Sequence, residues 1–283
     1  MKHYMMLFPE GKTKAVTFSY DDAIQSDRRF IELLNKYNLK GSFNISSNMC
    51  IEAEKQENPR NIKLSEIKEA YKGHEIASHG FTHPHLDRLP IEAMSYEIYQ
   101  DRLTLEKASG QIVKGFVYPY GNYNEDTITA LRLNGLVYAR TCIGFPKHHE
   151  FDVPENWLEM DTTCHHADKR LFDLADTFIN EDPLRNWHRK AGFLFSIWGH
   201  TYEFDKEEEW ERIEELMSLV SNRSEVWYPT TIELYNYVKA YKSLDYSIDM
   251  NTIYNPSSFD IWLAKDGKPF VVPAGETISG LLH

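Results

Sequence analysis

Four short polar segments of this 283-residue sequence each follow an apolar run, and together they carry two carboxylates and three imidazoles. In chain order the segments are Asp21-Asp22 after residues 15–18, His79 and His83 after residues 75–78, Pro119-Tyr120-Gly121 after residues 112–117, and His200 after residues 193–198. Imidazoles and carboxylates hold catalytic zinc in proteins, and they also act as general acids and bases. These residue types together predict a metal-assisted hydrolase.

Each of these segments stands where a strand would end. In a barrel of alternating strands and helices, the carboxyl ends of the strands lie at one rim, so residues far apart in sequence can share a pocket. Two imidazoles and one carboxylate would leave a metal position open for water. The other carboxylate of Asp21-Asp22 could then accept a proton, and His200, from a different strand end, could return one. A backbone N–H in the turn at Tyr120 could stabilise an oxyanion.

Helix signals alternate with the apolar runs along most of the chain. The expected helices follow Ser26, run from Pro90 to Gly110 and from Asn124 to Gly135, and cover residues 171–179 and 231–241. Asp205 and Glu208 form a capping-box pattern, which predicts a further helix through Trp210. Repeated strand and helix units of this length predict a parallel sheet, either open or closed into a barrel.

The pattern changes after about Ser243. Turn pairs such as Asn255-Pro256 and Asp266-Gly267 separate short β-like runs, and no helical period is visible there. We therefore expect two parts, a barrel over residues 1–242 and a small β-rich C-terminal appendage over residues 243–283 that packs on it.

Composition excludes several classes of protein. The net charge of −12 and the absence of a basic run argue against nucleic acid as a partner, and more weakly favour a neutral oligosaccharide over a strongly anionic polymer. No segment reaches the roughly 18 apolar residues of a membrane span, and the first residues lack a signal-peptide pattern. Cys50, Cys142 and Cys164 lie too far apart for a thiolate zinc site. We expect a cytoplasmic protein, although a chain whose leader had been removed would look the same.

The segment 17–23, Thr-Phe-Ser-Tyr-Asp-Asp-Ala, and the later His79-Gly80-Phe81-Thr82-His83 resemble the polysaccharide deacetylase family, carbohydrate esterase family 4. The resemblance covers most of residues 12–242. It implies a distorted (β/α) TIM-like barrel that removes N- or O-linked acetyl groups from glycans with a divalent metal. By resemblance, Asp22, His79 and His83 are the metal ligands and Asp21 is the general base. The backbone N–H of Tyr120 then helps to bind the oxyanion, and His200 is the general acid.

One position departs from the family pattern. The family usually has Arg before its Pro-Tyr segment, whereas this chain has Val117 at the matching position. The cation that orients the base is therefore missing there. Arg140, at the end of the next predicted strand, could reach the same carboxylate, and we take that replacement as a hypothesis.

Other polar and aromatic residues carry weaker expectations. His165 and His166 are adjacent, so we expect their side chains to diverge and not to share one metal, and we take His165 as a candidate substrate contact. Trp198, Tyr202 and Glu203 flank His200 and could line a sugar subsite, but a core Trp198 and a solvated Glu203 are equally compatible with the sequence.

The sequence thus predicts a metal-dependent hydrolase that removes acetyl groups from a carbohydrate by attack of metal-bound water. The expected cofactor is a divalent metal, zinc before cobalt or manganese. Two alternatives keep the same site: a hydrolase of a small non-sugar amide, and a glycan-binding paralogue without turnover, which Val117 motivates. The sequence does not fix the oligomeric state, the sugar, or whether the acetyl group is N- or O-linked.

Overall fold

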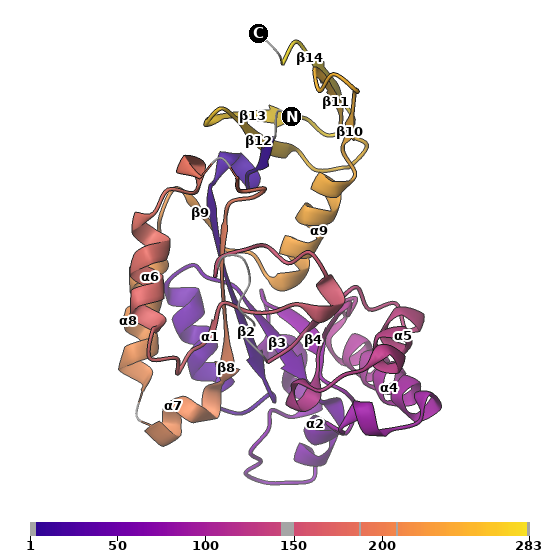
Figure 1. Ribbon diagram of the computed structural model, residues 1–283. Helices are drawn as coiled ribbons and strands as arrows, with labels where there is room; N and C mark the ends of the chain where they lie inside the picture. The colour runs from indigo at the N-terminus through magenta and orange to yellow at the C-terminus, as the bar shows by residue number, and fades with distance from the viewer. Residues whose placement is uncertain (1–3, 143–149, 187, 208, 282–283) are drawn as a thin grey trace.

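The computed structural model describes residues 4–142, 150–186, 188–207 and 209–281. Its centre is one parallel sheet with the strand order β6-β5-β4-β3-β2-β8-β7, in which β9 also pairs with the start of β2. The strands are β2 (Lys14–Asp21), β3 (Gly41–Ile45), β4 (Glu75–Ser78), β5 (Gly115–Val117), β6 (Tyr138–Arg140), β7 (Cys164–His165), β8 (Phe193–His200) and β9 (Val226–Trp227). The sheet curls into part of a barrel, which confirms the predicted α/β fold (Figure 1).

Helices cover the outside of the curled sheet. They are α1 (Asp27–Lys36), α2 (Ser47–Ala53), α3 (Ile67–Ala70), α4 (Ile91–Ser109), α5 (Glu125–Leu133), α6 (Leu171–Asn180), α7 (Thr201–Glu207), α8 (Trp210–Val220) and α9 (Thr231–Lys242). Helices α1, α6 and α8 lie on one side in Figure 1, and α4 packs with α5 on the other. All eight residues of β2 are buried, as expected for a strand covered on both faces.

Several helix boundaries follow the local signals in the sequence. Helix α4 begins directly after Pro90 and ends at Gly110, which adopts the left-handed conformation with φ of 73°. Asn124 caps α5, because its side chain accepts a hydrogen bond from the backbone N–H of Thr127.

The predicted capping box at Asp205 is wrong. Asp205 lies inside α7, and α8 begins at Trp210 after Glu209; Glu208 lies outside the described residues. Helix α7 follows β8 directly, so Asp205 lies within α7 and is not the N-cap of the next helix. Its carboxylate instead accepts a hydrogen bond from the indole Nε1 of Trp210 at 2.9 Å.

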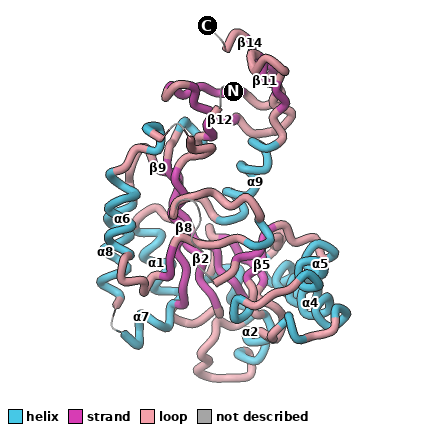
Figure 2. The backbone as a smooth tube through the Cα atoms, viewed as in Figure 1, coloured by secondary structure: helices cyan, strands magenta, loops and turns pink. Residues whose placement is uncertain are grey.

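The end of the chain is rich in strands, which lie beyond the end of α9 at one end of the molecule (Figure 2). One antiparallel sheet has the order β1-β12-β13 and a second has the order β10-β11-β14. These strands are β1 (Met5–Met6), β10 (Asp245–Tyr246), β11 (Thr252–Tyr254), β12 (Ile261–Lys265), β13 (Lys268–Val272) and β14 (Thr277–Ser279). The β appendage is therefore present, and it includes a strand from the beginning of the chain. The division into two domains at residue 242 stays a prediction.

Among the described helices, none combines the length and the apolar character that crossing a bilayer would require.

Candidate active site

Asp22, His79 and His83 offer one ligand atom each, and the three atoms lie within 4.8 Å of one another. The Nε2 atoms of the two histidines are 3.1 Å apart, and they lie 4.0 and 3.9 Å from Oδ1 of Asp22. The Nδ1 atom of His79 lies 2.8 Å from the carbonyl oxygen of Val117. A ring that donates from Nδ1 to a carbonyl leaves a lone pair on Nε2, which is the usual arrangement of a metal-binding histidine. The donor set therefore fits a divalent metal such as zinc.

The electrostatics of His83 agree with that fit. Burial and the neighbouring His79 ring lower the pKa of His83 to about 4. Its imidazole is then neutral at physiological pH, and the neutral ring is the form that binds a metal.

Strained backbone marks this part of the molecule. Asp22, His83 and Tyr120 have φ angles of 82°, 57° and 59°, a left-handed region that residues other than glycine rarely adopt. Such conformations persist where the surrounding structure requires them, and they cluster at functional sites. The turn at Asp22 directs its carboxylate away from that of Asp21, so the two adjacent acids enter different environments.

The side chain of Asp101 fixes the end of β4 that carries His79. One of its carboxylate oxygens accepts hydrogen bonds from the hydroxyl of Ser78 at 2.6 Å and the backbone N–H of His79 at 3.1 Å. The other accepts hydrogen bonds from the backbone N–H and hydroxyl of Ser47, at 2.7 and 2.5 Å. Asp101 lies on α4 and is fully buried. The sequence reasoning missed it, because an acidic residue within a helix pattern carries no sign that it will be buried.

Asp21 is buried and hydrogen-bonded. Nη2 of Arg140 lies 2.6 Å from each of its carboxylate oxygens, and Nδ2 of Asn44 donates to Oδ1 at 2.7 Å. Burial alone would raise the pKa of Asp21, but Arg140 together with His79 and His200 lowers it to about 2. Arg140, at the end of β6, therefore supplies the cation that Val117 cannot. Its guanidinium is itself buried, and it stacks 4.7 Å from the ring centroid of Trp198.

His200 lies between two carboxylates. Its Nε2 is 4.0 Å from Oδ2 of Asp21, and its Nδ1 is 3.5 Å from Oε2 of Glu203. The second distance is at the long limit of a hydrogen bond, so the interaction is chiefly electrostatic. Burial alone would lower the pKa of His200, but Glu203 and the charges of Asp21 and Asp22 raise it above its usual value.

Several nitrogen atoms lie close to one carboxylate oxygen of Glu203. Its Oε2 lies 3.2 Å from Nε2 of His165, 3.1 Å from Nε2 of His166 and 3.2 Å from the backbone N of His200. The expectation that the adjacent histidines diverge is therefore wrong. His165 is the last residue of β7 and His166 follows it, so the alternation of side chains along a strand does not continue across the pair. Burial would raise the pKa of Glu203, but His165, His166 and His200 keep it below its usual range.

His165, His166 and Glu203 form a second group close enough to hold a metal, but their hydrogen bonds fit one poorly. Nδ1 of His165 accepts the backbone N–H of Ala167 at 3.1 Å, so the proton of the neutral ring is on Nε2, facing Glu203. Among the described residues, Nδ1 of His166 has no hydrogen-bond partner, whereas a ligating histidine normally donates from its second nitrogen. The group therefore consists of two histidines that donate to one carboxylate.

The side chains of Tyr120 and Trp198 border the site from two sides. The Tyr120 ring is 55% exposed and lies 3.8 Å from the His85 ring and 4.7 Å from the His83 ring. Trp198 packs edge-on against His165 at 4.6 Å. The structure therefore places all of the predicted site residues around the carboxyl ends of β2, β4, β6, β7 and β8 and the turn that follows β5.

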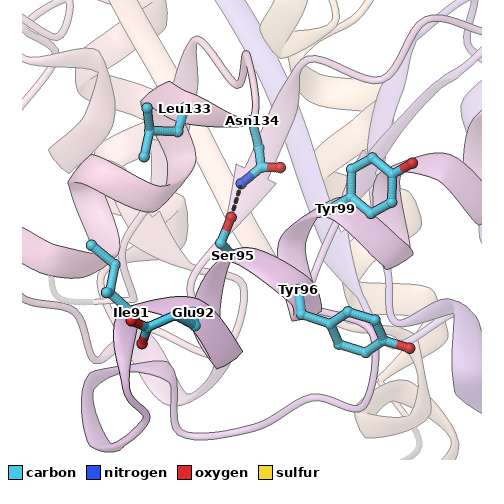
Figure 3. Close-up of a pocket in the computed structure, with 7 residues that line it drawn as sticks. All are labelled: Ile91, Glu92, Ser95, Tyr96, Tyr99, Leu133 and Asn134. Carbon is cyan, nitrogen blue, oxygen red and sulfur yellow. Dashed lines mark hydrogen bonds between the residues drawn. The ribbon is translucent and has the colours of Figure 1, made fainter.

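A hollow on the outer surface between α4 and α5 is unrelated to this site (Figure 3). It is lined by Tyr96 and Tyr99 of α4 and by Leu133 of α5, and Asn134 donates a hydrogen bond to Ser95 at 3.0 Å. These residues offer neither the imidazoles nor the paired carboxylates of the strand ends.

The fold and the site define a class of protein: an α/β protein whose curled parallel sheet carries acids and imidazoles at the carboxyl ends of its strands. Residues 9–139 match the sequence model of the family described as Polysaccharide deacetylase. The matched residues carry three of the four polar segments, and over them the chain is similar to the polysaccharide deacetylase family. A search of curated proteins found no match.

Solved structures with a similar fold have low sequence identity to this chain. A proposed polysaccharide deacetylase from Mycobacterium smegmatis is 19% identical with a TM-score of 0.60, over 86% of this chain and 96% of that one. A CE4 family pseudoenzyme from Bacillus anthracis is 15% identical with a TM-score of 0.50, over 81% and 67%. A Streptococcus pyogenes deacetylase in complex with acetate is 22% identical with a TM-score of 0.40; the match covers 44% of this chain and 54% of that protein.

Proposed function

We propose that this protein is a metal-dependent hydrolase that removes N- or O-linked acetyl groups from a carbohydrate. The observation that carries the proposal is the pairing of two differently held acids: Asp22 faces His79 and His83, while Asp21 is fixed by Arg140. A site of this kind separates a ligand carboxylate from a proton-accepting one. The match of residues 9–139 to the sequence model of the polysaccharide deacetylase family supports the substrate class.

Asp22, His79 and His83 would hold the metal, and their donor types favour zinc. When bound, such a cation acidifies a water molecule toward a pKa of about 7 and polarises an acyl oxygen. Asp21, ionised and hydrogen-bonded on both oxygens, accepts the proton of the attacking water.

The leaving amine or hydroxyl needs a proton, and in this proposal His200 donates it. The two carboxylates around His200 raise its pKa, which increases the protonated fraction near neutral pH. The backbone N–H of Tyr120, beside the metal ligands, would donate to the developing oxyanion and contribute about 3 kcal/mol of transition-state stabilisation.

Two other functions compete with this one. A small non-sugar amide could be hydrolysed by the same residues, and turnover of such an amide without acetate release from sugars would favour it. Val117 motivates the second alternative, a glycan-binding paralogue without turnover. The contact between Arg140 and Asp21 weakens that motive, because a cation orients the carboxylate in the absence of the family's arginine.

The test combines metal content with acetate release. The protein is stripped of metal, reconstituted with zinc, cobalt or manganese, and assayed on N- and O-acetylated oligosaccharides. We expect Asp22→Ala to lose both bound metal and activity. Asp21→Asn should keep the metal and lower turnover by about 100-fold or more, which is within the range for removal of a general base. The exposed Asp126, in the first turn of α5, provides the control Asp126→Asn.

Equal metal loss in Asp22→Ala and Asp21→Asn would contradict the division of roles between the two acids. A protein that binds one metal per chain but releases no acetate from any sugar would contradict the proposed reaction and favour the amide or the binding role.

A further inference from the structure

A short loop containing Arg60 is fixed against the segment that follows the proposed ligand Asp22. The backbone N–H of Gln25 donates to the carbonyl of Arg60 at 3.0 Å, and the N–H of Ile62 donates to the carbonyl of Ala23 at 2.8 Å. Between them, Nδ2 of Asn61 donates to the carbonyl oxygen of Asp22 itself at 2.7 Å. The position of Arg60 is therefore set by the same backbone that positions Asp22.

The guanidinium of Arg60 lies against Tyr202, which is two residues beyond His200. Its central carbon is 5.2 Å from the centroid of the Tyr202 ring, and Nζ of Lys206 is 4.5 Å from the same centroid. The Tyr202 ring in turn lies 5.1 Å from the ring of His200. Two cations thus flank one tyrosine at the edge of the candidate active site.

Arg60 and the acids of the site both affect the pKa of one side chain, that of Tyr202. Burial and the carboxylates of Glu203, Asp22 and Asp21 raise the pKa of Tyr202, and Arg60 opposes them. Both Arg60 and Lys206 are exposed. Within the described part of the chain, neither side chain forms an ion pair or a hydrogen bond, so their N–H groups remain available to a ligand.

This pair of cations contrasts with the net charge of −12 of the whole chain. Buried Arg140 is committed to Asp21, whereas Arg60 and Lys206 are exposed and uncommitted beside the acid His200. We propose that Arg60 and Lys206 form a subsite for a carboxylate on the substrate, so that the preferred glycan is an acetylated oligosaccharide containing an acidic sugar. This inference rests on the proposed deacetylase function, and it names the class of sugar that the site prefers.

The chemistry of the pair favours a carboxylate. A guanidinium that stacks on an aromatic ring keeps its N–H groups directed outward in its own plane, where they can make two parallel hydrogen bonds to a carboxylate. Lys206, on the next turn of α7, adds a second positive charge on the same ring. The overall negative charge would repel an anionic polymer at a distance, so the preference should be local and limited to the sugar next to the reacting acetyl group.

The experiment compares an acetylated oligosaccharide that contains a uronic acid with its methyl ester, in which an added methyl group removes the carboxylate charge. Rates of acetate release are measured for the metal-reconstituted protein and for Arg60→Gln, Lys206→Gln and a control, Lys268→Gln, an exposed cation in the C-terminal strands. We expect Arg60→Gln to lower kcat/KM on the acid roughly tenfold, as for loss of a charged hydrogen bond, and to leave the ester nearly unchanged. Lys206→Gln should have a smaller effect in the same direction, and Lys268→Gln none.

Binding of the same two oligosaccharides to Asp21→Asn, with and without Arg60→Gln, is measured by calorimetry. This arm separates the two proposals. If neither sugar releases acetate, the deacetylase function fails, and the calorimetry still decides whether Arg60 selects the carboxylate. Equal affinity for acid and ester, or an equal loss on both after Arg60→Gln, would overturn the carboxylate subsite.

Discussion

At the scale of single residues, neighbours in sequence contact different partners because the backbone turns between them. Asp21 ends β2 in extended conformation, whereas Asp22 has a φ of 82°, and one carboxylate meets Arg140 while the other meets two histidines. His165 and His166 show the reverse case, since both reach Glu203. The first pair could be assigned from its motif. The second could not, because the convergence depends on where β7 ends.

Glu203 should set the pH at which His200 loses its proton. Its carboxylate raises the pKa of His200, so removing the charge lowers that pKa. If His200 is the acid, activity is present below its pKa and falls as pH rises through it. Glu203→Gln should therefore move the basic limb of the kcat profile to lower pH, with the acidic limb little changed.

The measurement is a set of pH-rate profiles for the wild type, Glu203→Gln and the control Glu211→Gln, which removes an exposed carboxylate on α8. A merely structural role for Glu203 would lower the rate equally at every pH. An unshifted basic limb would thus refute the proposal that Glu203 raises the pKa of His200.

At the scale of elements, the arrangement of the site follows from parallel strands whose ends lie at one rim. The predicted strands over residues 15–18, 75–78 and 193–198 correspond to β2, β4 and β8, although β2 and β8 continue to Asp21 and His200 themselves. This is why the site could be assembled from the sequence, including the contact from Arg140. The sequence could not show that β8 passes directly into α7, because the apolar pattern does not mark where the strand ends and the helix begins. The sequence alone is therefore compatible with Glu203 either in a sugar subsite or in solvent.

Helix α4 contributes to the site through Asp101, which joins it to the ends of β4 and to α2. Asp101→Asn keeps the size of the side chain but turns an N–H group toward donors from Ser47, or from Ser78 and His79. We expect a loss of about 3 kcal/mol in the free energy of unfolding, because a buried hydrogen-bonded charge is replaced by a mismatched amide. Metal affinity at His79 should fall roughly tenfold, as for other residues that orient metal ligands.

Urea unfolding and competition with a zinc chelator measure the two effects. Glu92→Gln, at an exposed position in the first turn of the same helix, should change the stability by less than about 0.5 kcal/mol. Wild-type metal affinity in Asp101→Asn would show that the end of β4 is fixed without this carboxylate.

At the scale of the whole molecule, the C-terminal strands and the barrel share one apolar cluster. Leu263 of β12 and Ile253 of β11 are fully buried with Leu234 and Tyr237 of α9 and with Met6 from the start of the chain. The Tyr237 hydroxyl donates to the carbonyl of Leu7 at 2.9 Å and accepts the N–H of Trp262 at 3.0 Å. Removal of the last strands would therefore expose side chains that belong to both parts.

Because the cluster is shared, weakening it from the C-terminal side should destabilise the active site as well. Leu263→Ala should cost about 3 kcal/mol, since it removes a fully buried side chain, while Ile248→Ala, at a fully exposed position, should cost less than about 0.5 kcal/mol. Urea unfolding is followed by tryptophan fluorescence and by release of zinc from the site at Asp22. We expect both signals to shift together in Leu263→Ala, as one cooperative transition. An early fluorescence change with an unshifted release of zinc would mean that the C-terminal strands unfold separately, and that the predicted boundary near residue 242 divides two independent folding units.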